Sequence, residues 1–260
     1  MTPEATKPAI DTVGLTKHFG RFPAVENLGL SVHPGEVFGF LGPTGAGKTT
    51  TIKMLMGMLV PTSGTAHIGG LDCFGQRVEV KRLVGYLPDV PVFYDYLRGR
   101  EILRFMGQMH GIERRELEKR QQRLLERLAL NDAQEEYAIN YSMGMKKKLA
   151  LACALIHDPP VLILDEPTNG LDPRASRQIQ SLITESAAGG RTIFLSTHLL
   201  DMAERLCHRV GIIDRGHLAA VGTTNELQGT LARGGSLEEV FFAVTAPDEN
   251  ESADIAGGER

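Results

Sequence analysis

The sequence predicts an α/β fold with a mainly parallel sheet, an N-terminal antiparallel β addition and an inserted helical subdomain. Four short segments are almost continuously apolar, as parallel strands covered on both faces are: Val37–Leu41, Val161–Leu164, Thr192–Leu195 and Val210–Ile213. Stretches with helical periodicity lie between them. A chain of 260 residues, 42% of them hydrophobic, suits one large domain with a subdomain.

The N-terminal segment has the pattern of half-buried strands. Its apolar residues alternate with polar or small ones: Val13 and Leu15, then Leu28, Leu30 and Val32. A period of two residues is typical of strands with one face in a core and the other toward solvent. We therefore expect an antiparallel addition before the first parallel strand.

The second half contains helices with clear start signals. Asp172 is a candidate N-cap, and Pro173 suits the first helical position. One face of this helix is apolar, through Ile179, Leu182 and Ile183, and Gly189-Gly190 closes the segment. A similar apolar pattern follows the next strand: Leu199, Met202, Ala203 and Leu206.

A mainly helical block interrupts the α/β core. Its helical segments are Glu101–His110, Glu113–Leu130 and Ser142–His157. We expect a helical subdomain over about residues 91–157 and a core formed by residues 10–90 and 158–245. Residues 246–260 are acidic and poor in apolar side chains, which predicts a disordered tail.

Composition excludes several classes of protein. The net charge of −4 gives no reason to expect non-specific binding of nucleic acid, which usually needs a basic face, so no nucleic-acid partner is expected. No apolar run approaches the ~20 residues that span a bilayer. Residues 1–10 lack the apolar centre of a signal peptide. Cys73, Cys153 and Cys207 have no metal-ligand spacing, so we expect packed, reduced thiols in the cytosol.

The most specific motif follows the strand Val37–Leu41 and has the form G-x-x-x-x-G-K-[ST]. Glycines there let successive N–H groups surround a polyphosphate, and the next helix adds positive potential. Lys48 reaches the β- and γ-phosphates, and the Thr49 hydroxyl suits Mg²⁺. The segment predicted to bind the nucleotide comprises Gly42, Pro43, Thr44, Gly45, Ala46, Gly47, Lys48, Thr49 and Thr50. The motif predicts a nucleoside triphosphate site.

Two further strand ends complete this site. Asp165 and Glu166 follow Val161–Leu164. Asp165 is placed to hold Mg²⁺, and Glu166 to polarise the attacking water. Ser196-Thr197-His198 follows another buried strand and is expected to open a helix, where His198 would sense the γ-phosphate. Ordinary surface residues are the alternative for both segments, and the phosphate loop favours the functional interpretation.

In this order the motifs resemble the ATP-binding subunit of an ABC transporter, over about residues 10–245. Tyr141-Ser142-Met143-Gly144-Met145-Lys146 stands where that family has its Leu-Ser-Gly-Gly-Gln signature and retains Ser142 and Gly144. Asn169-Gly170-Leu171-Asp172 matches the D-loop, and His198 matches the switch histidine. As an N-cap, Ser142 would leave a helix end that attracts an anion.

The resemblance implies a P-loop NTPase fold and a head-to-tail homodimer that sandwiches two ATP molecules with Mg²⁺. Ser142 and Gly144 would contact the ATP held by the opposite copy. Phe19 is similar in position to the aromatic residue that stacks on adenine. Asp89 aligns with the Q-loop glutamine. Whether Asp89 ligates the metal together with Thr49 and Asp165 stays open. Lys48, Glu166 and His198 would be the catalytic residues.

The resemblance also implies a function. The chain would be an ATPase on the cytoplasmic face of the cell membrane that powers export through a separate multi-span permease. Glu226-Leu227 and Leu237–Phe242 resemble the ending of exporter-type subunits of drug and antibiotic systems. The alternative is a soluble ABC ATPase without a transport role, as in iron–sulfur assembly. An ABC ATPase acting on DNA or ribosomes fits less well. The partner docked near Tyr86–Leu97 would discriminate between them.

Overall fold

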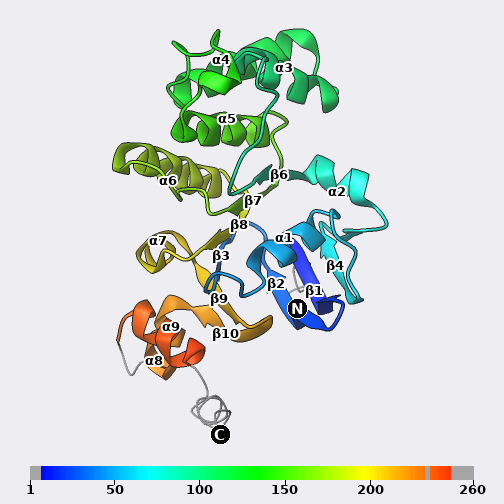
Figure 1. Cartoon of the computed structure of the whole chain (residues 1–260), viewed down its shortest axis with the longest axis vertical. Helices are drawn as coiled ribbons and strands as arrows, with labels where there is room; N and C mark the ends of the chain where they lie inside the picture. The colour runs from blue at the N-terminus through cyan, green and yellow to red at the C-terminus, as the bar shows by residue number, and fades with distance from the viewer. Residues whose placement is uncertain (1–6, 232–234, 247–260) are drawn as a thin grey trace, which may run out of the picture.

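The computed structural model describes residues 7–231 and 235–246 and contains two sheets with a helical block at one end (Figure 1). The larger sheet has the order β10-β9-β3-β8-β7-β6. Its strands are β3 (Val37–Leu41), β6 (Val84–Leu87), β7 (Val161–Asp165), β8 (Thr192–Thr197), β9 (Arg209–Asp214) and β10 (His217–Thr223). All neighbours are parallel except β10 and β9. The predicted α/β class and mainly parallel sheet are confirmed.

The smaller sheet is antiparallel and has the order β2-β1-β4-β5. Its strands are β1 (Ile10–Phe19), β2 (Phe22–Val32), β4 (Ser63–Ile68) and β5 (Leu71–Asp72). The predicted antiparallel addition is confirmed. It is larger than predicted, because β4 and β5 return to it from beyond the first helix.

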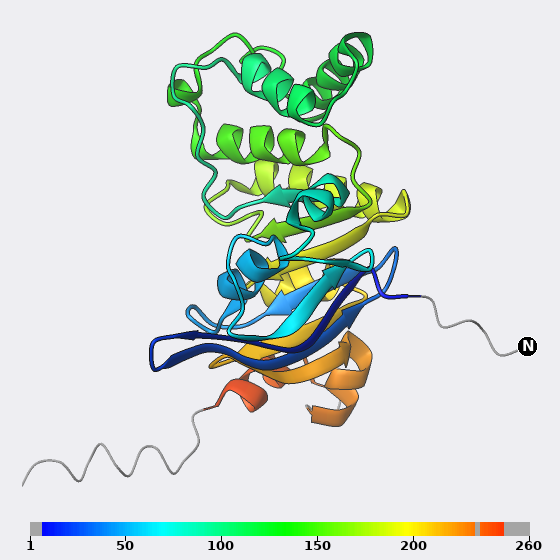
Figure 2. The ribbon, with the colours of Figure 1, turned by 90° about the vertical axis from the view of Figure 1, so that its right-hand side faces the viewer.

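Helices cover the larger sheet and extend past one of its edges (Figures 1 and 2). They are α1 (Lys48–Leu55), α2 (Arg77–Leu83), α3 (Gly99–Met109), α4 (Arg114–Arg127), α5 (Met143–Leu155), α6 (Pro173–Ala188), α7 (Leu200–Leu206), α8 (Thr224–Leu231) and α9 (Leu237–Thr245). A 3₁₀ turn covers Ala138–Asn140. None of these described helices is both long and apolar enough to cross a bilayer.

Side-chain caps begin two of the helices that matter for the site. The Asp172 carboxylate accepts hydrogen bonds from the backbone N–H groups of Arg174 and Ala175, with Pro173 in the first turn of α6. The Ser142 hydroxyl accepts from the N–H of Met145 at the start of α5. Both predicted caps are confirmed.

The expectation that Ser196-Thr197-His198 opens a helix is wrong. The strand β8 runs on through Thr197, and α7 begins at Leu200. Parallel pairing with β3 on one side and β7 on the other extends over Ser196 and holds these residues extended. His198 therefore lies just beyond the strand, in the turn before α7.

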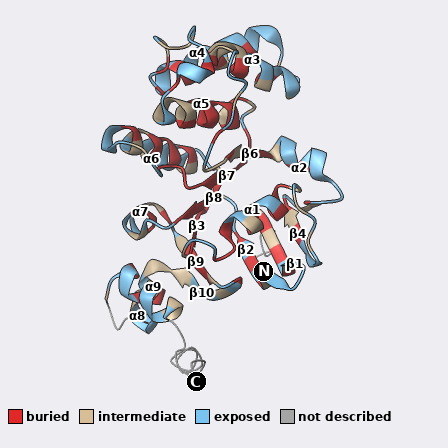
Figure 3. Cartoon of the chain, in the orientation of Figure 1, coloured by how far each residue is buried: buried red, intermediate tan, exposed pale blue. Residues whose placement is uncertain are grey.

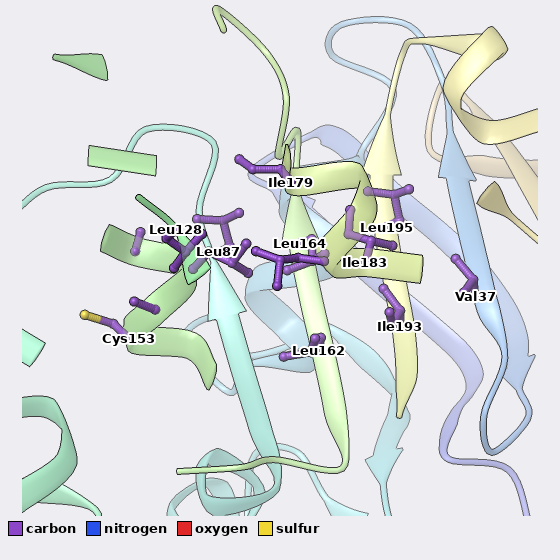
Figure 4. Close-up of a cluster of buried hydrophobic side chains, with 14 of the residues drawn as sticks. Val37, Leu87, Leu128, Cys153, Leu162, Leu164, Ile179, Ile183, Ile193 and Leu195 are labelled. Atoms are coloured by element: carbon purple, nitrogen blue, oxygen red, sulfur yellow. The ribbon is translucent and has the colours of Figure 1, made fainter. Parts of the chain in front are cut away.

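The core lies on both faces of the larger sheet, which explains the continuous apolar strands (Figure 3). All five residues of β7 are buried. Figure 4 shows one face, where α5 and α6 pack on the sheet. The other face packs against β1, β2 and α1, with Phe38, Phe40 and Phe194 at its centre. This double cover fixes the strand ends from which the site is built.

The helical block comprises α3, α4 and α5, which pack on one another, and α5 also contacts β6. His110, the C-cap of α3, stacks on His157, with ring centroids 3.7 Å apart. The Nε2–H of His157 donates to the Val84 carbonyl at 3.2 Å. Burial, together with the charge of His110, lowers the pKa of His157 to about 4. The predicted boundaries at about 91 and 157 remain predictions.

The three cysteines are free and buried, as predicted. Burial raises the pKa of Cys73, Cys153 and Cys207 to about 12. Such thiols are packed apolar groups at neutral pH. The acidic tail predicted for residues 246–260 lies, apart from Ala246, outside the described residues.

Candidate nucleotide-binding site

The loop between β3 and α1 is a tight turn that depends on glycine. Gly47 has φ +111°, and a Cβ there would lie 2.5 Å from the Ala24 carbonyl oxygen. A Cβ on Gly42 would lie 2.3 Å from the Ile213 carbonyl oxygen. Only glycine fits at these two contacts. The chain then enters α1 at Lys48, whose helix N-terminus favours an anion.

The Lys48 side chain folds back over this loop. Its Nζ donates to the carbonyl oxygens of Gly42 at 2.6 Å and Pro43 at 3.0 Å. Burial lowers the Lys48 pKa, while the charges of Glu166 and Asp165 act in the opposite direction. The ammonium is therefore held at the mouth of the loop beside two carboxylates.

Asp165 ends β7 between two hydroxyl groups. The Ser196 Oγ donates to Asp165 Oδ1 at 2.6 Å, because Asp165 and Ser196 are partners in the parallel ladder. The Thr49 Oγ1 donates to Asp165 Oδ2 at 3.3 Å. Burial raises the Asp165 pKa, and the two hydroxyl hydrogen bonds oppose that rise. No role was assigned to Ser196 from the sequence, because its contact with Asp165 depends on the pairing of β7 with β8.

Glu166 leaves the strand in a left-handed backbone conformation, with φ +46°. His198 Nδ1 lies 3.0 Å from Glu166 Oε1. Glu166 Oε2 is buried and has no hydrogen-bond partner among the described residues. A buried carboxylate oxygen without a partner is costly, so it marks a place for a polar ligand or water.

These side chains surround one cleft of about 260 Å³. Its lining residues are Thr44, Gly45, Gly47, Lys48, Thr49, Thr50, Asp89, Asp165, Glu166, Asn169 and His198. The structure thus brings together residues predicted from four separate motifs. Their roles remain predictions.

Some predicted residues lie elsewhere. Gly42, Pro43 and Ala46 form the loop behind the cleft without lining it in the described structure. Phe19 lies at the end of β1, half exposed, with Lys17 Nζ 5.3 Å from its ring centroid. Ser142 and Gly144 lie at the start of α5, outside this chain's cleft.

Asp89 lies on the cleft wall next to a lysine that sequence reasoning missed. Lys147 Nζ is 3.4 Å from Asp89 Oδ1, and the Asn169 side-chain amide donates to the same oxygen at 3.3 Å. Lys147 belongs to a run of three lysines, and every residue from Leu149 to Ala154 on the same helix is buried. Helical spacing therefore does not distinguish Lys147 from Lys146 and Lys148, and its burial could not be predicted from the local sequence.

The residues present fit a magnesium-bound nucleoside triphosphate. The loop amides and Lys48 offer donors to phosphate oxygens. The Thr49 hydroxyl and the Asp165 carboxylate are hard oxygen ligands of the kind that Mg²⁺ prefers. Glu166, which carries the unpartnered oxygen, also lines this cleft.

Comparison with known sequences identifies relatives over most of the chain. The profile of the ABC transporter family matches residues 25–169. The daunorubicin/doxorubicin resistance ATP-binding protein DrrA of Streptomyces peucetius is 38% identical over 223 residues, 86% of this chain and 68% of that protein. The bacitracin transport ATP-binding protein BcrA of Bacillus licheniformis is 41% identical over 210 residues, 80% of this chain and 68% of that protein.

One relative is much longer than this chain. The probable multidrug ABC transporter ATP-binding protein YbhF of Escherichia coli is 38% identical over 223 residues. The match covers 86% of this chain and 38% of that protein, so the chain spans well under half of its length.

Among solved structures, an ATP-binding subunit of an ABC transporter superposes with a TM-score of 0.86 and 32% identity. The match covers 91% of this chain and 99% of that one. The cbiO1 protein of Clostridium perfringens, part of the ABC transporter complex cbiONQ, gives a TM-score of 0.76 at 25% identity, over 86% of this chain and 92% of that one.

Proposed function

The chain belongs to the ABC transporter family, and from this membership we propose that it binds and hydrolyses ATP with Mg²⁺ to power export through a separate membrane permease. The observation that supports hydrolysis best is the single cleft that gathers Lys48, Thr49, Asp165, Glu166 and His198.

The phosphate loop and α1 hold the triphosphate. The loop N–H groups and Lys48 Nζ donate to phosphate oxygens, and binding draws Lys48 away from the Gly42 and Pro43 carbonyls. Thr49 and Asp165 would hold Mg²⁺, and Ser196 orients the Asp165 carboxylate by its hydrogen bond to Oδ1. When bound, Mg²⁺ neutralises charge on the phosphates.

Glu166 and His198 act on the γ-phosphate side. Glu166 Oε2, which has no partner among the described residues, accepts a proton from the attacking water. The water oxygen forms a bond to the γ-phosphorus while the bond from the γ-phosphorus to the oxygen that bridges the β- and γ-phosphates breaks. This step releases ADP and phosphate. His198 orients the carboxylate through Oε1.

A second copy of the chain completes the site. Ser142 and Gly144 start α5 outside the chain's own cleft, and the α5 N-terminus is an anion-attracting helix end. A head-to-tail homodimer would place this end against the partner's ATP. Phe19, exposed at the end of β1, would stack on adenine.

An apolar groove of about 570 Å³ gives the permease a docking surface. Its lining residues are Tyr86, Pro88, Pro91, Val92, Phe93, Tyr94, Leu97, Ile102, Phe105, Met106, Ala150 and Cys153. Val92 is 86% exposed and Tyr94 is 74% exposed. Large exposed apolar side chains at a groove favour a protein partner. The chain would thus lie on the cytoplasmic face of the membrane, held by the permease.

The names of the relatives favour export over a soluble role. DrrA and BcrA are named for drug resistance and bacitracin transport. The proposed substrate is by analogy a drug-like or antibiotic molecule. A soluble ABC ATPase of the iron–sulfur assembly type remains the second candidate, because it would share the catalytic residues.

Glu166→Gln tests the hydrolysis step. The amide keeps the shape of the side chain but no longer accepts a proton, so we expect ATP turnover to fall by about 100-fold or more. ATP binding should persist, and ATP-bound dimer should accumulate on size exclusion. Steady-state ATPase rates and nucleotide titration measure both effects. Near-normal turnover would contradict the assigned role of Glu166.

Co-purification tests the transport role. The tagged chain, extracted from its native cells in mild detergent, should retain a stoichiometric multi-span membrane protein. Val92→Glu places a charge in the groove and should release that partner while leaving ATP turnover intact. Recovery of only soluble partners, with the chain absent from washed membranes, would favour the second candidate.

A further inference from the structure

Lys147 is a buried cation beside the catalytic machinery. Its side chain is 1% exposed, although it lies on α5 between two partly exposed lysines. Burying an ammonium is strongly unfavourable unless its donors find partners. Lys147 Nζ donates to the Glu166 carbonyl at 2.5 Å and the Asn169 carbonyl at 2.8 Å, and it pairs with Asp89 Oδ1 at 3.4 Å. These contacts match its three N–H donors.

The two carbonyl acceptors bracket the turn that carries the catalytic carboxylate. Glu166 has φ +46°, a conformation that is strained in a residue other than glycine and persists only where its surroundings hold it. The Asn169 N–H donates to the Glu166 carbonyl at 3.1 Å and closes the turn. Lys147 binds that same Glu166 carbonyl. The ammonium therefore contributes directly to keeping Glu166 in its conformation.

The third partner of Lys147 is Asp89, at the Q-loop position, and it connects that segment to the 166–169 turn. Asp89 follows β6, whose neighbour β7 carries Asp165, and its Oδ1 accepts from both Lys147 and Asn169. The carboxylate thereby balances the charge of the lysine. A neutral glutamine, as in the family pattern, would remove the carboxylate that pairs directly with the ammonium and leave only the charges of Glu166 and Asp165 nearby.

The helix that carries Lys147 begins at Ser142. One rigid α-helical turn joins the two residues, with the Lys146 N–H bonded to the Ser142 carbonyl at 2.9 Å. A shift of the α5 N-terminus is therefore transmitted to Nζ and to the turn at Glu166. This connects the end of α5 proposed to face the partner's ATP with the carboxylate of the chain's own site.

We propose that Lys147 is a positioning residue for hydrolysis: it holds the 166–169 turn, with Asp89 as its counter-ion, and ties the orientation of Glu166 to α5. The inference rests on the proposed ATPase function. It assigns Asp89 to charge balance and turn geometry, where the family resemblance left open a metal contact.

Lys147→Met removes the charge and the donors but nearly keeps the volume. We expect kcat to fall about 10- to 100-fold per ATP-binding site, while the Kd of MgATP stays within about 3-fold, because the phosphate loop is untouched. Lys148→Met is the matched control: its charge acts chiefly with those of Asp172 and Arg174, and its kcat should stay within about 2-fold. Equal kcat in Lys147→Met and the wild type would overturn the proposal.

A double-mutant cycle separates the two roles of Asp89. If Asp89 is the counter-ion, Lys147→Met/Asp89→Asn should lose no more turnover than Lys147→Met alone. If Asp89 instead ligates the metal independently, the two losses should multiply, which would overturn the assigned pairing.

Hydrogen exchange of the nucleotide-free protein gives a readout that needs no turnover. Amides of residues 166–172 should exchange about 10-fold faster in Lys147→Met than in the wild type or Lys148→Met. Unchanged exchange would overturn the proposal. A wild type that does not hydrolyse ATP would instead refute the proposed function and leave this readout valid. Should Lys147→Met fail to fold, Lys147→Gln keeps donors for the carbonyls and should show a smaller loss; undiminished turnover would again overturn the proposal.

Discussion

At the scale of the residue, a substitution of Lys48 should weaken nucleotide binding without affecting the stability of the fold. Its hydrogen bonds are to carbonyls of its own loop, so Lys48→Ala should change the thermal midpoint little. A charge-assisted bond to phosphate is worth about 1.5–3 kcal/mol, so MgATP affinity should fall about 10- to 100-fold. Calorimetric titration measures the affinity, with Lys53→Ala on the same helix as a control. An unchanged affinity would remove Lys48 from the phosphate site.

Some residues of the cleft could be predicted from short local motifs, and others could not. Gly42–Thr49 and Asp165-Glu166 were predictable, because short motifs at strand ends dictate phosphate and metal chemistry locally. Ser196 was not, because its contact with Asp165 arises from the register of two strands about 30 positions apart. Lys147 was not predictable either, because Lys146 and Lys148 also stand at helical spacing from buried residues, and its partners come from two other segments of the chain.

At the scale of the element, Ser142 has two proposed roles at the start of α5: it caps the helix, and it contacts the phosphate of the ATP bound to the partner copy. Ser142→Asp keeps a good N-cap but places a negative charge where the partner's phosphate should lie. We expect unchanged stability and ATP binding by the monomer, but no ATP-dependent dimer. Ser142→Ala should lose about 1 kcal/mol of stability and retain the dimer. Dimerisation by Ser142→Asp, measured by light scattering in the Glu166→Gln background, would contradict the cross-subunit site.

Elements with a local signature were predicted well, and those that depend on distant partners were not. The apolar strands and the capped helix α6 matched their predicted positions. The edge strand β10 and the return strands β4 and β5 were missed. Ladders with β9 and β1 hold them in place, and their own sequences lack a strong apolar pattern. The turn after β8 was misread for the same reason, since the neighbouring strands keep Ser196 and Thr197 extended.

At the scale of the whole molecule, the His110–His157 stack joins the helical block to β6 and makes stability depend on pH. The pKa of His157 is about 4 in the folded protein, against 6.5 for an exposed histidine. Between these values the unfolded chain binds more protons, so the free energy of unfolding falls as the pH falls through this window and levels off below it. Partial exposure limits the loss to about 1–2 kcal/mol.

Urea unfolding at pH 7 and pH 4.5 measures this effect, with His157→Gln as the comparison. Glutamine keeps an N–H donor for the Val84 carbonyl but does not titrate. The wild type should lose more stability than the variant between the two values. Parallel losses would show that carboxylates alone set the pH dependence.

The three buried thiols give each region of the molecule its own probe of opening. Cys73 lies beside β5, Cys153 in α5 at the wall of the apolar groove, and Cys207 after α7. All three are buried and essentially fully protonated at neutral pH, so alkylation by iodoacetamide is slow until the surrounding region opens. Mass spectrometry of the three peptides would therefore follow breathing of the small sheet, the helical block and the larger sheet separately, in a chain that carries no introduced label.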